Sequence, residues 1–253
     1  MSRAKQIRVG VLLLVLTLVG VDAWRTRRLT RAWGRTLRVE IHAMAAEASP
    51  DVQAYVDALE AGAFADVGPF LDAEAGRFRA MPSPLVTIRV GAPIHEPPPA
   101  PPESEGVLAA VQYSLRLRWY AFEHGEGGDV RLFVLYHAAT KGRVLEHSIG
   151  IPEGRIGVLQ LFADEAAGPA NQVVVAHEIL HTFGATDKYD ARGIPLFPEG
   201  YAEPGRSPRT PQEKAEIMAG RVPLSPSEAR LPASLAECVV GEATAAEMHW
   251  RVE

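Results

Sequence analysis

Two histidines four residues apart constrain the fold of this chain more than any other feature. The run is His177-Glu178-Ile179-Leu180-His181. On an α-helix, residues four apart lie on the same face, so the two imidazoles can point at a single metal ion. The apolar run 173–175 and the apolar residues inside the motif indicate that this helix is buried. A buried glutamate beside two buried histidines needs polar partners, and a cation provides them.

Three further residues extend this motif into a candidate catalytic centre. Glu178 lies on the helix beside the predicted metal, where a carboxylate can accept a proton from a water molecule. Gly184 is expected to adopt a left-handed conformation that ends the helix and turns the chain back. This turn brings Asp187 within reach of the metal. Three protein ligands with an open fourth position are typical of catalytic rather than structural zinc, so we expect Zn²⁺ on His177, His181 and Asp187.

The full pattern is more specific than its first half. A bare His-Glu-x-x-His run arises by chance in roughly one chain in a hundred of this size, and the Gly and Asp positions lower that rate by about two orders of magnitude. The alternative is a buried helix whose histidines hydrogen-bond to neighbours without a metal. That alternative would make the chain a metal-free structural domain.

These residues resemble the extended signature of the metzincin metallopeptidases, which continues through a glycine to a third ligand. In most of that clan the third ligand is histidine. Asp187, followed by Lys188 and Tyr189, is similar to the aspartate variant of the snapalysin family of small bacterial secreted proteases. A methionine in a tight turn beneath the zinc also marks the clan, and Ile217-Met218-Ala219-Gly220 fits it in type and order. The resemblance covers roughly residues 130–250.

The resemblance implies an α+β, metzincin-like zincin fold. Its mixed twisted sheet would precede the helix of the zinc motif, and a helical C-terminal subdomain would follow the methionine turn. The strand before the zinc helix, near Ile156–Phe162, would lie close to an antiparallel sheet edge that binds a substrate chain as an added strand. The implied activity is that of a zinc-dependent metalloendopeptidase acting on peptides or proteins, with Met218 as an apolar floor.

Several residues compete for roles at this site. Asp190 is an alternative third ligand, and Glu199 or Glu203 would serve if the ligand came from a later helix, although nearby prolines disfavour one. Tyr189 and Tyr201 are candidates for an oxyanion donor or a fifth ligand, and both can also simply pack. A second function class is a membrane-anchored zinc-binding or scaffolding module without proteolytic activity.

Length and composition bound the remaining possibilities. The chain has 253 residues, 47% of them hydrophobic, which suffices for one sizeable catalytic domain, expected at residues 36–253. A net charge of −5 argues against nucleic acid as a partner, and we expect a monomer. The single cysteine, Cys238, excludes an internal disulfide and is expected in a buried C-terminal helix.

The N-terminus suggests targeting to a membrane. Basic residues precede an apolar stretch from Val9 to Val21, whose length fits a signal-peptide core and is short for a full span. An arginine-rich flank follows, with Trp24 and Trp33 as candidate interfacial residues. The flank would hold the remainder in the cytoplasm by the positive-inside rule. We instead expect residues 1–35 to be a signal-anchor or transmembrane segment, with an extracytoplasmic domain at the periplasm or cell surface, or a secreted domain if the segment is cleaved.

Periodicity predicts the other elements. Alternating or apolar runs predict strands, and residues spaced on one helical face predict helices. The helix expected from Gly106 to Glu123 would bury Val107, Val111, Leu115 and Tyr120. The expected strands are 36–43, 85–90, 130–137, 143–149 and 156–163, and the other expected helices are 49–59, 67–78 and two pieces within 226–250, with a proline-rich loop at 93–102.

Overall fold

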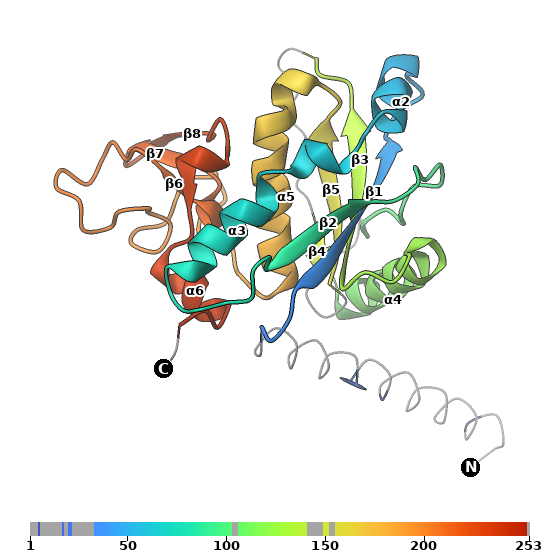
Figure 1. The fold of residues 1–253 in the computed structure, drawn as a ribbon, viewed down its shortest axis with the longest axis horizontal. Coiled ribbons are helices and arrows are strands. Elements are labelled where there is room, and N and C mark those ends of the chain that lie inside the picture. Colours follow the sequence, from blue (N-terminus) through green and yellow to red (C-terminus); the bar gives the residue numbers. More distant parts are fainter. Residues whose placement is uncertain are drawn as a thin grey trace.

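A five-stranded sheet forms the centre of the N-terminal part (Figure 1). The computed structural model describes residues 33–102, 106–140, 149–151 and 155–251, with Lys5, Thr17, Gly20 and Val21. The strand order is β2-β1-β3-β5-β4. The strands are β1 (Leu37–Ala45), β2 (Val86–Val90), β3 (Val130–His137), β4 (Ile149–Ile151) and β5 (Ile156–Phe162). The first four in this order run parallel, and β4 is antiparallel to β5. The architecture is mixed α and β, which agrees with the expected α+β class at that level.

The antiparallel edge of the sheet lies beside residues 156–162, near where the resemblance implied it, and the sequence left open which strand forms this edge. β5, which directly precedes the zinc-motif helix, is an internal parallel strand, and β4 is the antiparallel edge. The predicted strand at 143–149 falls mostly on residues 141–148, which lie outside the described residues. The connection from β4 to β5 is short, which suits an antiparallel pair, whereas parallel neighbours need a longer crossover.

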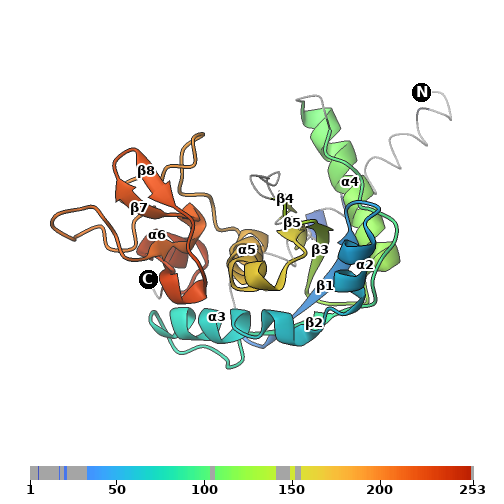
Figure 2. The same cartoon turned by 90° about the horizontal axis from the view of Figure 1, so that it is seen from above.

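Helices cover both faces of the sheet, which explains why β1, β3 and β5 are buried along most of their lengths. In β1, Val39 and Ile41 face the main core with the helices α2 (Pro50–Asp57), α3 (Val67–Gly76) and α5 (Gly168–Thr182). Met44 faces a smaller cluster beneath α4 (Val107–His124) on the opposite side (Figure 2). As predicted, Ser49 caps α2 by accepting a hydrogen bond from Val52 N. A 3-10 turn, η1 (Ala61–Phe64), joins α2 to α3.

The buried face of α4 matches the prediction only in part. Tyr120 is buried as expected, beside the fully buried Leu117 and Ala121, whereas Val111 is 49% exposed and Leu115 is 39% exposed. This helix carries apolar residues on two opposite faces, so periodicity alone could not identify the face that meets the sheet. Leu108, Trp119 and Phe122 join the exposed side.

The C-terminal part lies on the far side of α5 from the sheet, as both views show (Figures 1 and 2). The expected helical subdomain is mostly wrong, because its only α-helix among the described residues is α6 (Glu242–Glu247). Pro226 and Pro232 interrupt helical periodicity, and Cys238 lies buried in a strand. The other elements are β6 (Ala215–Glu216), η4 (Ile217–Ala219), β7 (Val222–Ser225), β8 (Glu228–Arg230), η5 (Leu235–Glu237) and β9 (Cys238–Val239).

The expected signal-anchor or transmembrane segment at residues 1–35 needs correction. Within the described residues, no helix combines the length and apolar character needed to cross a bilayer. Most of the stretch Val9–Val21 lies outside those residues. Trp33 is a core residue instead of an interfacial one: it is 3% exposed, and its Nε1 donates a hydrogen bond to Met248 O at 2.7 Å. Its ring also contacts Phe183 and Trp250, so the folded domain begins before Thr36.

Candidate metal centre

Helix α5 carries the histidine motif between the sheet and the C-terminal part. Its apolar face is fully buried at Val175, Ile179 and Leu180. Pro169 occupies the first turn, where its missing N–H costs nothing, and the Asn171 amide donates to Phe162 O at 2.9 Å. These contacts fix the start of the helix against the end of β5. The second half of the helix is therefore held firmly where the two histidines project.

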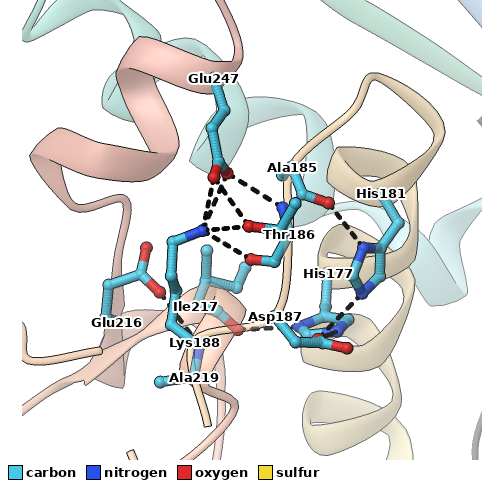
Figure 3. A network of polar contacts seen from close by, with 10 residues as sticks. All are labelled: His177, His181, Ala185, Thr186, Asp187, Lys188, Glu216, Ile217, Ala219 and Glu247. Atoms are coloured by element: carbon cyan, nitrogen blue, oxygen red, sulfur yellow. Dashed lines mark hydrogen bonds and ion pairs between the residues drawn. The ribbon is translucent and has the colours of Figure 1, made fainter. Parts of the chain in front are cut away.

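Backbone carbonyls orient both imidazoles. His177 Nδ1 lies 2.9 Å from Ile217 O, and His181 Nδ1 lies 2.8 Å from Ala185 O (Figure 3). Because a carbonyl only accepts, each Nδ1 carries the proton and each Nε2 is left with a lone pair in the neutral ring. The side chains are 14% and 19% exposed, so the site is partly open. This is the tautomer that a metal ligand requires.

The chain turns sharply after α5. Gly184 has φ of 103°, a left-handed conformation that favours glycine. Its N–H donates to His181 O at 3.0 Å, and Ala185 N donates to Leu180 O at 3.2 Å. The turn satisfies the last carbonyls of the helix and reverses the chain toward the histidines.

This turn brings Asp187 to both imidazoles. Its Oδ1 lies 3.3 Å from His177 Nε2 and 3.1 Å from His181 Nε2. Burial opposes the charged carboxylate, but hydrogen bonds to the two histidines outweigh it and hold the pKa of Asp187 well below its usual range. Burial likewise disfavours the imidazolium of His177, yet its acidic neighbours raise the pKa of that ring. The three side chains thus gather around one point that favours positive charge.

Glu178 completes the group. It is 4% exposed, and its carboxylate and the nitrogens of His177 and His181 all lie within 4.8 Å of one another. Among the described parts of the chain, His177, Glu178 and His181 are the only set of three or more histidine, cysteine and acidic side chains whose ligand atoms lie this close together. Two imidazole lone pairs facing a carboxylate fit a divalent cation. Nitrogen and oxygen donors of this kind suit zinc and also other transition metals.

The methionine turn supports the histidines from below. Met218 is fully buried in η4, and Gly220 closes the turn with φ of 64°. Glu216 lies beneath it, also fully buried, and accepts from Ala219 N at 3.0 Å and Gly241 N at 3.0 Å. Burial raises the pKa of Glu216 despite these hydrogen bonds. Since the same turn supplies the carbonyl that orients His177, Glu216 stabilises the site indirectly. This role was not predicted from the sequence.

The two tyrosines are placed differently. Burial, together with the charge of Asp187 and a hydrogen bond to it, raises the pKa of Tyr189 to about 12. Tyr189 therefore lies at the ligand group. Tyr201 is buried against Phe197, with ring centroids 5.4 Å apart, and lines a separate cavity of about 620 Å³. Its position gives no support to a role at the ligands.

The alternative third ligands point elsewhere. The carboxylate of Asp190 accepts hydrogen bonds from Arg192 and from Ile194 N at 3.0 Å, so it stabilises its own loop. Glu199 is exposed on that loop. Glu203 forms an exposed ion pair with Arg206 at 3.4 Å. Asp187 is thus the carboxylate that the fold brings to the histidines.

Searches of family models, curated proteins and solved structures returned no match to this chain.

Proposed function

We propose that this protein is a zinc-dependent metalloendopeptidase with a metzincin-like site. One observation carries the proposal: Asp187 Oδ1 lies 3.3 and 3.1 Å from the Nε2 atoms of His177 and His181. Glu178 lies buried beside them on the same helix. Three converging ligands with a neighbouring carboxylate are the set that hydrolytic zinc sites use.

Each residue has a distinct role in this proposal. Bound zinc would supply an electrophilic centre that makes a water molecule more acidic and polarises the scissile carbonyl. Glu178 accepts the proton as the water oxygen adds to the carbonyl carbon. It then donates that proton to the amide nitrogen as the C–N bond breaks. The Tyr189 hydroxyl, protonated at neutral pH, is a candidate donor to the developing oxyanion.

An edge strand of the sheet suits a peptide substrate. Among the described strands, β4 pairs only with β5 and is therefore an edge strand. An extended peptide can hydrogen-bond to such an edge as an added strand. The antiparallel edge strand and the methionine turn both agree with what the metzincin resemblance implies. Met218 contributes an apolar floor and no ligand.

The test pairs zinc content with hydrolysis of casein, using the full chain and its Glu178→Gln variant. We expect about one zinc per chain in both proteins, with cleavage in the wild type and at least a hundredfold less in the variant. Glu165→Gln is a matched control, because Glu165 is exposed and lies just before α5.

The outcomes separate the competing functions. Zinc in both proteins with no cleavage of any unstructured substrate would favour a zinc-binding module without proteolytic activity. Absence of zinc from the wild type would reject the metal centre itself. Equal cleavage by the wild type and Glu178→Gln would remove Glu178 from its role as the base.

A further inference from the structure

The segment that carries Asp187 is held from the side opposite the histidines. Thr186 and Lys188 flank Asp187, and both point toward α6 while Asp187 points toward the imidazoles (Figure 3). The Asp187 side chain is itself 41% exposed. Apart from its contacts with the two imidazoles, the position of the carboxylate is set by the backbone on either side of it.

Glu247, near the end of α6, receives four hydrogen bonds from this segment. Thr186 N donates to Oε2 at 2.9 Å, and the Thr186 hydroxyl donates to Oε1 at 2.7 Å. Lys188 Nζ donates to both carboxylate oxygens, at 2.8 and 2.9 Å. One carboxylate thus fixes the residues on each side of Asp187.

Lys188 closes the network. Its side chain is only 3% exposed, and its Nζ also donates to Thr186 O at 2.8 Å. A buried ammonium without a carboxylate would be strongly unfavourable, so Lys188 and Glu247 are kept together. The Lys188 N–H also donates to Met218 O at 3.0 Å, which ties the same segment to the methionine turn. The segment therefore has anchors on two neighbouring elements.

We propose that Glu247 is a positioning residue for the third metal ligand, acting through Thr186 and Lys188 to hold Asp187 against His177 and His181. The inference rests on the proposed metal centre. It also gives the C-terminal helix α6 a function at the site, although α6 contributes no ligand. Residues that orient metal ligands from outside the coordination shell commonly change metal affinity by ten- to a hundredfold.

The experiment measures zinc affinity in the full chain by competition with a chromophoric chelator, together with Tm with and without zinc. The variants are Glu247→Gln, Lys188→Met and their double mutant. The control is Glu242→Gln, which removes another carboxylate from the same helix. Glu242 forms an exposed ion pair with Arg251 at 2.7 Å. We expect Glu247→Gln to raise the zinc Kd about tenfold, with no change in Glu242→Gln.

The zinc-dependent increase in Tm distinguishes positioning from simple stability. A merely structural role would lower Tm with and without zinc and leave both that increase and the Kd unchanged, which would overturn the proposal. A positioning role makes the increase smaller, because tighter binding to the folded state is what raises Tm. The effect of Lys188→Met on the Kd should also be smaller in the Glu247→Gln background, since the two residues act together.

Two further results keep the proposal falsifiable. If Glu247→Gln does not fold, Thr186→Val removes the two hydroxyl contacts, one to Glu247 and one from Lys188, and retains the Lys188–Glu247 ion pair. This variant should weaken zinc binding by a smaller factor. An unchanged Kd in Thr186→Val would then count against the proposal. If the wild type binds no zinc, the metal centre is rejected. If the wild type and Glu247→Gln bind zinc with the same Kd, only the positioning role is rejected.

Discussion

Asp187 is the residue on which the identity of the centre depends most directly. Its carboxylate contacts both histidines, while Asp190 is held by its own loop. We expect Asp187→Ala to lower zinc affinity by at least tenfold and Asp190→Ala to leave it unchanged. Asp187→His should retain zinc, because imidazole is an equally suitable ligand. Chelator competition measures all three.

The opposite ranking of the two alanine variants would make Asp190 the ligand. Equal, small losses in both would show that the metal is held by the histidines alone.

At the same scale, local spacing predicted only part of the site. His177, Glu178 and His181 were predictable because helical geometry relates them within one turn, and Gly184 because the return of the chain requires its φ. Glu247 was not predictable, since it meets Lys188 across 59 residues of sequence. A carboxylate directly before the apolar turn is a weak local indication that Glu216 is buried beneath it. Long-range hydrogen bonds leave no periodic trace in a sequence.

Among the elements, α4 offers the clearest test of the observed packing. Leu117 is fully buried beneath the helix, and Leu115 is 39% exposed on the other side. Leu117→Ala should lower the free energy of unfolding by about 2–5 kcal/mol, because it leaves a cavity in the core. Leu115→Ala should cost less than about 1 kcal/mol. Urea denaturation of the two variants provides the measurement.

Both leucines have the same volume and helix propensity, so the pair isolates burial. Equal losses in the free energy of unfolding, or a larger loss for Leu115→Ala, would show that the observed face of α4 is not the one that packs on the sheet.

The elements were predictable where pattern and burial agree. β1 and β3 have clear apolar runs bounded by turn residues, and their observed bounds match the expected ranges to within two residues. In α4, apolar residues lie on two opposite faces, so hydrophobic periodicity fits either face being buried. The C-terminal part shows another limit: strands of two to four residues are too short to establish a period, and tertiary contacts determine them.

For the whole molecule, the N-terminal boundary of the domain is the main revision. The arginine-rich flank suggested a segment at a membrane, yet Trp33 contacts the C-terminal Trp250, and Arg35 forms an ion pair with Asp129 at 2.6 Å. These contacts join the beginning of the described domain to the segment after α6 and to the turn before β3. Composition could not reveal them, because arginine and tryptophan suit both a headgroup region and a domain surface.

The Arg35–Asp129 pair predicts how stability should depend on pH. Burial would raise the pKa of Asp129, but hydrogen bonds from Arg35 and from Arg38 N outweigh it and lower that pKa. A carboxylate with a lowered folded-state pKa stabilises the fold above its unfolded pKa, near about 4, and this contribution is lost as pH falls through the folded value. Asp129→Asn should therefore be less stable than the wild type at pH 7. The difference should shrink as the pH falls through the folded-state pKa of Asp129, because both side chains are neutral below it. Thermal unfolding of the wild type and Asp129→Asn at a series of pH values measures this convergence. The control is Asp57→Asn, on the exposed surface of α2. A constant difference in stability at every pH would show that the Asp129 charge contributes nothing.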